Sequence, residues 1–398
     1  MEVRVSQRGN SLPASPIRKL KPYADAAIAR GIKIYNVNIG QPDIHTPPRF
    51  MEMMKTFENP VLAYGPAQGL DSYVEQLSAY YKRVGFDFGK NEIVTTQGGS
   101  EALLMAFSVV CDVDDEIIIP EPFYTNYNGF AVVAQCKVVP VLTRAEDGFH
   151  LPPKEVFEKA ITPRTKAIVV CSPNNPTGTV FTRAEIAMLC ELAKERGLFL
   201  ISDEAYREFV YDGEEYVSPL HFPEVADRTI LVDSISKRFS SCGARVGNLC
   251  TKNKEVYNAA LRFAMTRLCP ATVSQYMALA SMEIYDEYVA ACREQFLARR
   301  DVVLEVLAKD PRILAKPPRG AFYVIAKLPV DDADKFAIFM MEKFDSKGET
   351  TLVAPAGGFY ATPGMGKDEI RIAFVLDPDK MRRATEILLE GIEAYNNQ

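Results

Sequence analysis

TILVDSISKRFSSCGARVG, residues 229–247, begins with an apolar run and continues into a loop of small residues. The run from Thr229 to Val232 predicts a short buried strand, because such runs bounded by turn residues are typical of one. The loop contains Lys237, and its small side chains leave room for a ligand. With Arg245 eight residues further on, the loop suits an anion bound by hydroxyl and guanidinium groups. Alone the signal is weak, since a loop lysine is usually a solvated surface charge.

Similar apolar runs recur along the chain and alternate with helix-like segments. This alternation predicts an α/β fold, in which a mostly parallel sheet is covered by helices on both faces. Ligands of such sheets bind beyond the carboxyl ends of the strands. Asn175, Asp203 and residues 234–237 all follow predicted strands, so we expect them to meet at one site.

The chain changes character after Thr251. It is helical to about Leu307, with a break at residues 269–270, and then forms a compact α+β tail. We predict three parts: an N-terminal segment that belongs to the small domain, a large domain, and a C-terminal small domain, at residues 1–47, 48–290 and 291–398.

The amino-acid composition argues against several classes of function, namely nucleic-acid binding, membrane binding and metal binding. Of 398 residues, 47% are hydrophobic and 25% charged, which is ordinary for a soluble globular protein. A net charge of −6 gives no reason to expect nucleic acid or an anionic membrane as partner. We expect no signal peptide and no membrane helix. Eight scattered cysteines without a CxxC pair indicate reduced thiols in a cytoplasmic protein, and three separated histidines indicate no metal site.

Three further motifs accompany the lysine loop: SPNNPTG at 172–178, ISDEAY at 201–206 and EIRIAF at 369–374. In this order the set resembles the class I/II aminotransferases, which are fold-type I enzymes that use pyridoxal 5′-phosphate. The matching motifs run from Ile39 to Phe374, so the resemblance covers nearly the whole chain. It implies the fold-type I architecture and a homodimer with its sites at the subunit interface.

The resemblance implies that Lys237, Asp203 and Tyr206 are the catalytic residues. Lys237 would form a Schiff base with the cofactor aldehyde and then move the proton at the substrate Cα as general base. Asp203 would pair with the pyridine nitrogen, although an Asp here is equally typical of a helix N-cap. Asn175 and Tyr206 would hydrogen-bond the ring oxygen O3′.

The segment QGGSEALL, residues 97–104, follows a predicted strand and opens a helix. The first N–H groups of a helix are unpaired and, with the helix dipole, bind phosphate. An ordinary strand-to-helix turn has the same pattern, and only the resemblance favours a phosphate site at Gly99, Ser100 and Glu101. It also implies that Tyr124 stacks on the pyridine ring and that Ser234, Ser236 and Arg245 bind the phosphate. Tyr64 would reach the phosphate from the neighbouring subunit.

The resemblance assigns the substrate to Gly40, Asn175 and Arg371. Arg371 matches the arginine that grips the α-carboxylate bidentately. Apolar residues alternate with it along 369–374, so Arg371 lies on the opposite face of the strand, which is equally typical of a surface arginine.

Two departures from the family pattern concern the substrate. Residues 353–363 lack the Pro-Gly-x-x-Phe-Gly pattern that the family often has, and Ser100 stands where some bacterial aspartate aminotransferases carry a lysine. No arginine could be matched to the one that grips a dicarboxylate side chain. Aspartate is therefore a candidate substrate by overall resemblance and not by any residue.

The expected function is transfer of the amino group of an L-amino acid to a 2-oxo acid such as 2-oxoglutarate. One alternative is a pyridoxal phosphate-dependent carbon–sulfur β-lyase, whose products are pyruvate, ammonia and a thiol. Another is a non-catalytic ligand-sensing domain like those of some transcription regulators. The chain before Ile34 is too short for a DNA-binding domain, which disfavours a sensor.

Overall fold

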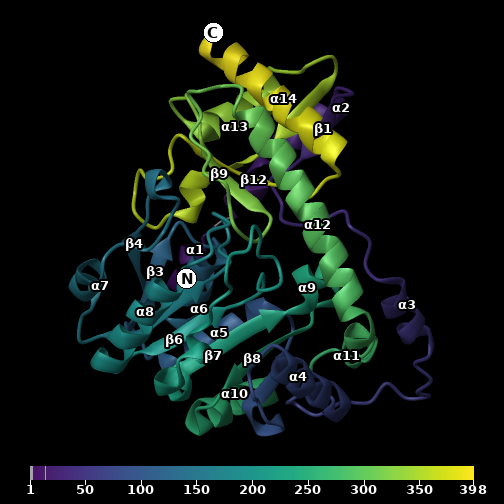
Figure 1. Cartoon of the computed structure of the whole chain (residues 1–398), viewed down its shortest axis with the longest axis vertical. Coiled ribbons are helices and arrows are strands. Elements are labelled where there is room, and N and C mark those ends of the chain that lie inside the picture. The colour runs from purple at the N-terminus through teal and green to yellow at the C-terminus, as the bar shows by residue number, and fades with distance from the viewer. Residues whose placement is uncertain (1–2, 14) are drawn as a thin grey trace.

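The computed structural model describes residues 3–13 and 15–398, and its largest element is a seven-stranded sheet (Figure 1). The strand order is β2-β8-β7-β6-β5-β3-β4. Strand β8 is antiparallel to both neighbours, and the other neighbouring pairs are parallel. The expected α/β fold with a mostly parallel sheet is confirmed. The strands are β2 (Ile93–Thr96), β3 (Glu116–Glu121), β4 (Lys137–Leu142), β5 (Thr165–Cys171), β6 (Phe199–Asp203), β7 (Thr229–Ser234) and β8 (Gly247–Thr251).

Helices cover both faces of this sheet. In β5, Ala167 and Val169 pack in one buried cluster with α5 and α10, whereas Ile168 and Val170 pack in another with α8. Successive side chains of a strand point to opposite faces, so a strand that is covered on both faces contains a continuous apolar run. The helices around the sheet are α4 (Asp71–Arg83), α5 (Gly99–Val110), α6 (Asn126–Ala134), α7 (Lys154–Ala160), α8 (Arg183–Arg196), α9 (Ile235–Arg238) and α10 (Lys254–Thr266).

A smaller α+β region joins the two ends of the chain. Strands β11, β12 and β9 form an antiparallel sheet, and β1 pairs in parallel with β10, so residues 33–36 lie with the C-terminal segment. Helix α12 runs from the large sheet to this region (Figure 1). The elements of this smaller region are α2 (Lys21–Ala29), β1 (Lys33–Asn36), α12 (Ser281–Leu307), β9 (Tyr323–Lys327), α13 (Ala333–Glu342), β10 (Glu349–Leu352), β11 (Ala354–Pro355), β12 (Glu369–Ala373) and α14 (Pro378–Asn396).

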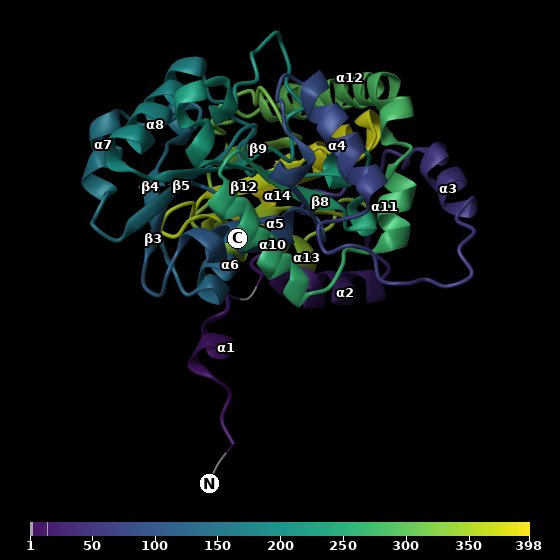
Figure 2. The same cartoon turned by 90° about the horizontal axis from the view of Figure 1, so that it is seen from below.

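Three short helices complete the chain: α1 (Gln7–Ser11), α3 (Pro48–Lys55) and α11 (Thr272–Ala278). The expected helix break at 269–270 falls between α10 and α11. Helix α1 projects away from the rest of the structure (Figure 2), and none of its residues is buried. None of the helices in the described ranges is long and apolar enough to span a membrane.

Candidate active site

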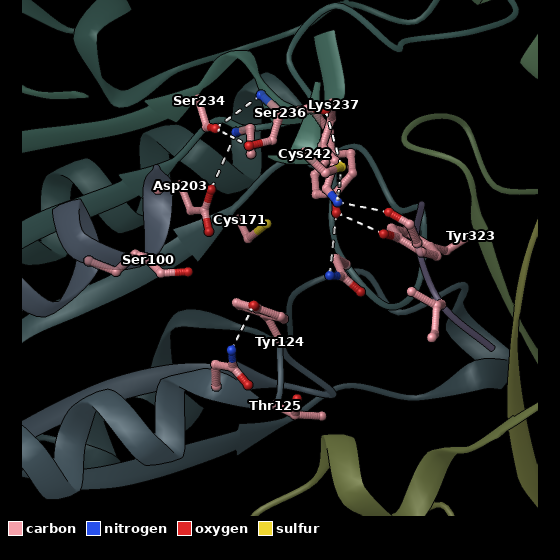
Figure 3. A pocket seen from close by; sticks show the side chains of 18 of the residues that line it. Ser100, Tyr124, Thr125, Cys171, Asp203, Ser234, Ser236, Lys237, Cys242 and Tyr323 are labelled. Atoms are coloured by element: carbon pink, nitrogen blue, oxygen red, sulfur yellow. Dashed lines mark hydrogen bonds between the residues drawn. The ribbon is translucent and has the colours of Figure 1, made fainter. Parts of the chain in front are cut away.

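A cavity of about 300 Å³ lies beyond the carboxyl ends of β5, β6 and β7, where they face β9 and β12 (Figure 3). The parallel strands of the sheet end together at this edge, so the polar residues that follow them converge. Except for Glu101 and Tyr64, all the predicted site residues line the cavity: Gly40, Gly99, Ser100, Tyr124, Asn175, Asp203, Tyr206, Ser234, Ser236, Lys237, Arg245 and Arg371.

Lys237 lies in the single turn of α9, which follows β7 directly. Ser234 caps this turn, because its Oγ accepts a hydrogen bond from the backbone N–H of Ser236 at 3.1 Å. The Lys237 Nζ donates to the carbonyl oxygen of Gly40 at 2.7 Å and lies 3.4 Å from the Sγ of Cys242. The amine is thus held at the cavity wall by neutral groups, and no carboxylate of the described residues pairs with it.

A buried cluster of charges holds the start of this turn. Asp233 accepts hydrogen bonds from the guanidinium groups of Arg207 at 2.6 Å and Arg238 at 2.5 Å, and from the backbone N–H of Ser234 at 2.6 Å. Arg238 also pairs with Glu208 at 2.7 Å. Burial opposes ionisation of Asp233, but the two guanidinium groups outweigh it and lower the pKa of the carboxyl. The cluster therefore fixes the backbone immediately before Lys237.

Asp203 ends β6 with its carboxyl group buried beside the cavity. The hydroxyl of Tyr127 donates to it at 2.7 Å, and the N–H of Ala205 at 3.3 Å. Burial raises the pKa of Asp203 to about 6. No helix begins at residues 204–206, so the N-cap alternative is wrong. In the described part of the chain no basic side chain pairs with Asp203, which leaves a buried carboxyl group suited to a cationic ligand.

Arg371 is buried in the centre of β12, so the surface alternative is wrong. Its guanidinium lies 4.6 Å from the ring centre of Tyr323 and 4.8 Å from that of Phe359. Its Nη1 donates to the side-chain oxygen of Asn175 at 2.9 Å and its Nη2 to the carbonyl of Asn38 at 2.6 Å, while Nε has no partner. Burial without a carboxylate lowers the pKa of Arg371. A carboxylate ligand would relieve that cost.

Two tyrosines lie between Arg371 and the large sheet. The hydroxyls of Tyr206 and Tyr323 are 2.8 Å apart, and Asn175 Nδ2 donates to Tyr206 at 3.5 Å. Burial raises the pKa of Tyr206 well above its usual value, so the hydroxyl stays protonated and can donate. A Cβ at Gly40 would lie 1.8 Å from the Tyr323 hydroxyl oxygen, so this wall of the cavity requires glycine at position 40.

The opposite end of the cavity is built where α5 begins. Gly98 has φ of +79°, and a Cβ there would lie 2.4 Å from the Arg245 guanidinium. A Cβ at Gly247 would lie 2.5 Å from the backbone of Gly98. Among the described residues, Arg245 donates only to carbonyl groups, those of Cys242 at 3.0 Å and Gln97 at 3.2 Å. A guanidinium beside an uncovered helix N-terminus suits a phosphate group.

Three further predicted residues lie differently with respect to the cavity: Tyr124 lines it, whereas Glu101 and Tyr64 do not. Tyr124 lines the cavity, and its hydroxyl accepts from Asn126 at 2.8 Å. The Glu101 side chain instead pairs with Arg267 and accepts from the N–H of Gln97, so only its backbone remains for an anion. Tyr64 is 81% exposed and does not line the cavity of its own chain.

The sequence alone did not predict the contacts that Tyr127, Asn38, Tyr323 and Phe359 make in the site. The rings of Tyr323 and Phe359 both contact the Arg371 guanidinium, although the three residues lie in separate segments of the chain. No local signal existed for Tyr323, which stands in an apolar run at residues 322–326. No local signal existed for Phe359, which lies in the segment that departs from the family pattern.

Comparisons with known proteins agree with this arrangement. The family model of class I and II aminotransferases matches residues 32–388. The aspartate aminotransferase of Sulfurisphaera tokodaii is 34% identical over 382 residues, which are 92% of this chain and 91% of that protein. That of Thermotoga maritima is 30% identical, with 99% of each chain covered. A mutant of the Thermus thermophilus aspartate aminotransferase superposes with a TM-score of 0.89 at 30% identity, covering 98% of this chain and 100% of that one.

Proposed function

The chain belongs to the class I and II aminotransferases and is a pyridoxal 5′-phosphate-dependent enzyme, and we propose that it moves the amino group of aspartate to 2-oxoglutarate in this cavity. One observation carries the assignment of the cavity. A buried arginine without a carboxylate, a buried aspartate without a cation and a lysine amine all line the same space. Aspartate is proposed because relatives over nearly the whole chain are aspartate aminotransferases.

The residues present fit the cofactor group by group. The start of α5 and the side chains of Arg245, Ser234 and Ser236 suit its phosphate, and the Asp203 carboxyl suits its protonated ring nitrogen. The Asn175 amide and the Tyr206 hydroxyl suit its ring oxygen. The bound cofactor supplies an electron sink that stabilises negative charge at the substrate Cα.

The side chains of this chain would bind the reactants and move the protons. Arg371 binds the α-carboxylate of the amino acid, and Asn175, already bonded to that guanidinium, orients it. Tyr127 holds the Asp203 carboxyl in place by its hydrogen bond, which keeps a negative charge at the ring nitrogen. The Lys237 amine would hold the cofactor aldehyde and, once the amino acid has replaced it there, would take the proton from the substrate Cα as general base.

We further propose a cytoplasmic homodimer in which the large domain spans residues 48–290 and the small domain combines 1–47 with 291–398. The exposed side chain of Tyr64 supports the dimer, because a tyrosine that serves the partner's site has no partner in its own chain. The pairing of β1 with β10 supports the small domain made from both ends.

The test is a single half-reaction without any 2-oxo acid. Purified enzyme loaded with the cofactor is mixed with individual amino acids, and the cofactor absorption and the products are followed. We expect aspartate to change the absorption and yield about one oxaloacetate per site without ammonia. Pyruvate, ammonia and a thiol from a sulfur amino acid would instead indicate a β-lyase. No absorption change with any amino acid would contradict the proposed function.

A further inference from the structure

Glu121 ends β3 with a side chain that is fully buried and does not line the cavity. Its Oε2 accepts hydrogen bonds from the backbone N–H groups of Ala361 at 2.7 Å and Thr362 at 3.0 Å. In the described part of the chain its Oε1 has no hydrogen-bond partner, and no basic side chain pairs with the group. Burying a carboxyl group without a cation is costly, and the two N–H groups are what offsets that cost.

The segment that Glu121 binds, residues 359–362, belongs to the smaller region but lies against the large sheet. Besides the two bonds to Glu121, the backbone N–H of Phe123 donates to the carbonyl oxygen of Phe359 at 2.9 Å. Ala361 packs against the buried cluster that contains residues of β3 and α5. Three hydrogen bonds from residues 121–123 therefore fix the backbone of 359–362 to the end of β3.

The same segment places an aromatic ring on the arginine of the cavity. Phe359 is fully buried, and its ring centre lies 4.8 Å from the Arg371 guanidinium. A guanidinium is attracted to the face of such a ring, and contact with the ring restricts its orientation. A bidentate grip on a carboxylate depends on that orientation. A shift of the 359–362 backbone would move the ring and leave Arg371 less well aligned.

We propose that Glu121 is a positioning residue for the α-carboxylate site: it anchors residues 359–362 and thereby keeps the Phe359 ring against the Arg371 guanidinium. The proposal rests on the proposed function of Arg371 as the group that binds the α-carboxylate. Glu121 does not line the cavity, so its effect on the substrate passes through Phe359.

The first experiment measures the steady-state kinetics of Glu121→Gln with aspartate and with alanine. An amide oxygen accepts hydrogen bonds more weakly than a carboxylate, so we expect KM to rise by about 5- to 10-fold for both amino acids. The value of kcat should change by less than about 2-fold, because the groups that move the proton are untouched. Glu121→Ala, which removes both bonds, should raise KM further.

Thr143→Val is the matched control. The Thr143 hydroxyl donates to the backbone carbonyl of Glu121 at 2.8 Å, so this variant loses a buried hydrogen bond at the same place but keeps the carboxyl group. It should match the wild type in KM. A similar rise in KM for Thr143→Val would mean that any disturbance at the end of β3 has this effect, and it would overturn the proposal. So would a wild-type KM in both Glu121 variants, or a loss confined to kcat.

A double-mutant cycle tests whether the effect passes through the ring. Calorimetry measures the binding of maleate, an unreactive dicarboxylate, to the cofactor-loaded wild type, Glu121→Gln, Phe359→Leu and the double variant. If Glu121 acts through Phe359, the double variant should bind maleate no more weakly than Phe359→Leu alone. Additive losses would overturn the proposal. Arg371→Lys is measured in parallel, and undiminished binding of maleate by that variant would instead show that the proposed function of Arg371 is wrong.

Discussion

The guanidinium of Arg371 donates a hydrogen bond to the side-chain oxygen of Asn175 at 2.9 Å, and this bond joins the small sheet to the large one. Arg371 comes from β12, and Asn175 from the loop after β5. The same guanidinium reaches the carbonyl of Asn38, so three distant segments meet at one group. Binding of a substrate carboxylate here would add a ligand to a contact that already spans both parts of the enzyme.

Replacing Arg371 by lysine should lower kcat/KM for aspartate and alanine alike, by about 100-fold or more. Lysine cannot reproduce the planar fork, and a lost partner of a buried charged contact costs about 2–5 kcal/mol. Steady-state kinetics with both amino acids measure the effect. An equal loss for both amino acids is expected, because both carry the α-carboxylate. Near wild-type kinetics with both would place the α-carboxylate elsewhere.

Asp203→Asn should retain bound cofactor but lose most turnover, because an amide cannot keep the ring nitrogen protonated. Turnover at saturating substrate and the cofactor content of the same sample measure both effects. Lost turnover with a full complement of cofactor is the expected result. If turnover stays normal, Asp203 acts only in the local turn, and its replacement should cost only stability.

The same variant should change how the stability of the cofactor-free enzyme depends on pH. The pKa of Asp203 is raised to about 6 by burial, from 3.8 in the unfolded chain. The folded state therefore binds the proton more tightly, so the stability that Asp203 contributes is present below pH 4 and is lost as pH rises to 6. The full difference is about 3 kcal/mol. Urea unfolding at pH 4 and at pH 6.5 should show a smaller decline for Asp203→Asn than for wild type, and an equal decline would contradict this assignment.

Asp233→Asn should destabilise the protein by about 3–5 kcal/mol, because Arg207 and Arg238 would remain buried without their shared carboxylate. Urea unfolding of the wild type and the variant measures the loss. The matched control is Asp286→Asn, which breaks an exposed ion pair with Arg83 and should leave the free energy of unfolding unchanged within error. Similar results for the two variants would mean that the buried cluster adds little.

Much of the fold was predictable because strands that are buried on both faces of a sheet appear in the sequence as continuous apolar runs. Strands β5, β6 and β7 each contain a continuous apolar run, which predicts a strand covered on both faces, and the polar residues that follow such strands are expected to meet. That expectation agrees with the cavity, since Asn175, Asp203 and Lys237 all line it.

The other features of the fold and the site could not be predicted, because they depend on contacts between segments that are distant in the sequence. Alternation along β12 indicated which face Arg371 occupies, but not that β11 and β9 flank this strand and that Phe359 covers the guanidinium. Asp233 stands in an apolar run, and nothing local showed that Arg207 would reach it.

The last prediction concerns Tyr64 and the proposed dimer. If its hydroxyl reaches the phosphate held by the partner subunit, two inactive variants should complement each other. Chains carrying Tyr64→Ala are unfolded together with chains carrying Lys237→Ala and are then reassembled with the cofactor. In each mixed dimer one site carries both defects and the other neither. Random pairing makes about half of the dimers mixed, so activity should return to at most about a quarter of wild type.

The interpretation requires that Tyr64→Ala alone be clearly impaired, which is measured first. The fraction of mixed dimers is then determined by pull-down of a tag on one of the two chains. Activity that rises with this fraction supports a tyrosine acting across the interface. If mixed dimers form but the mixture is no more active than its parents, Tyr64 acts within its own chain or not at the site. Its 81% exposure in the single chain favours the first outcome, because a side chain with so few contacts in its own chain is free to contact a partner.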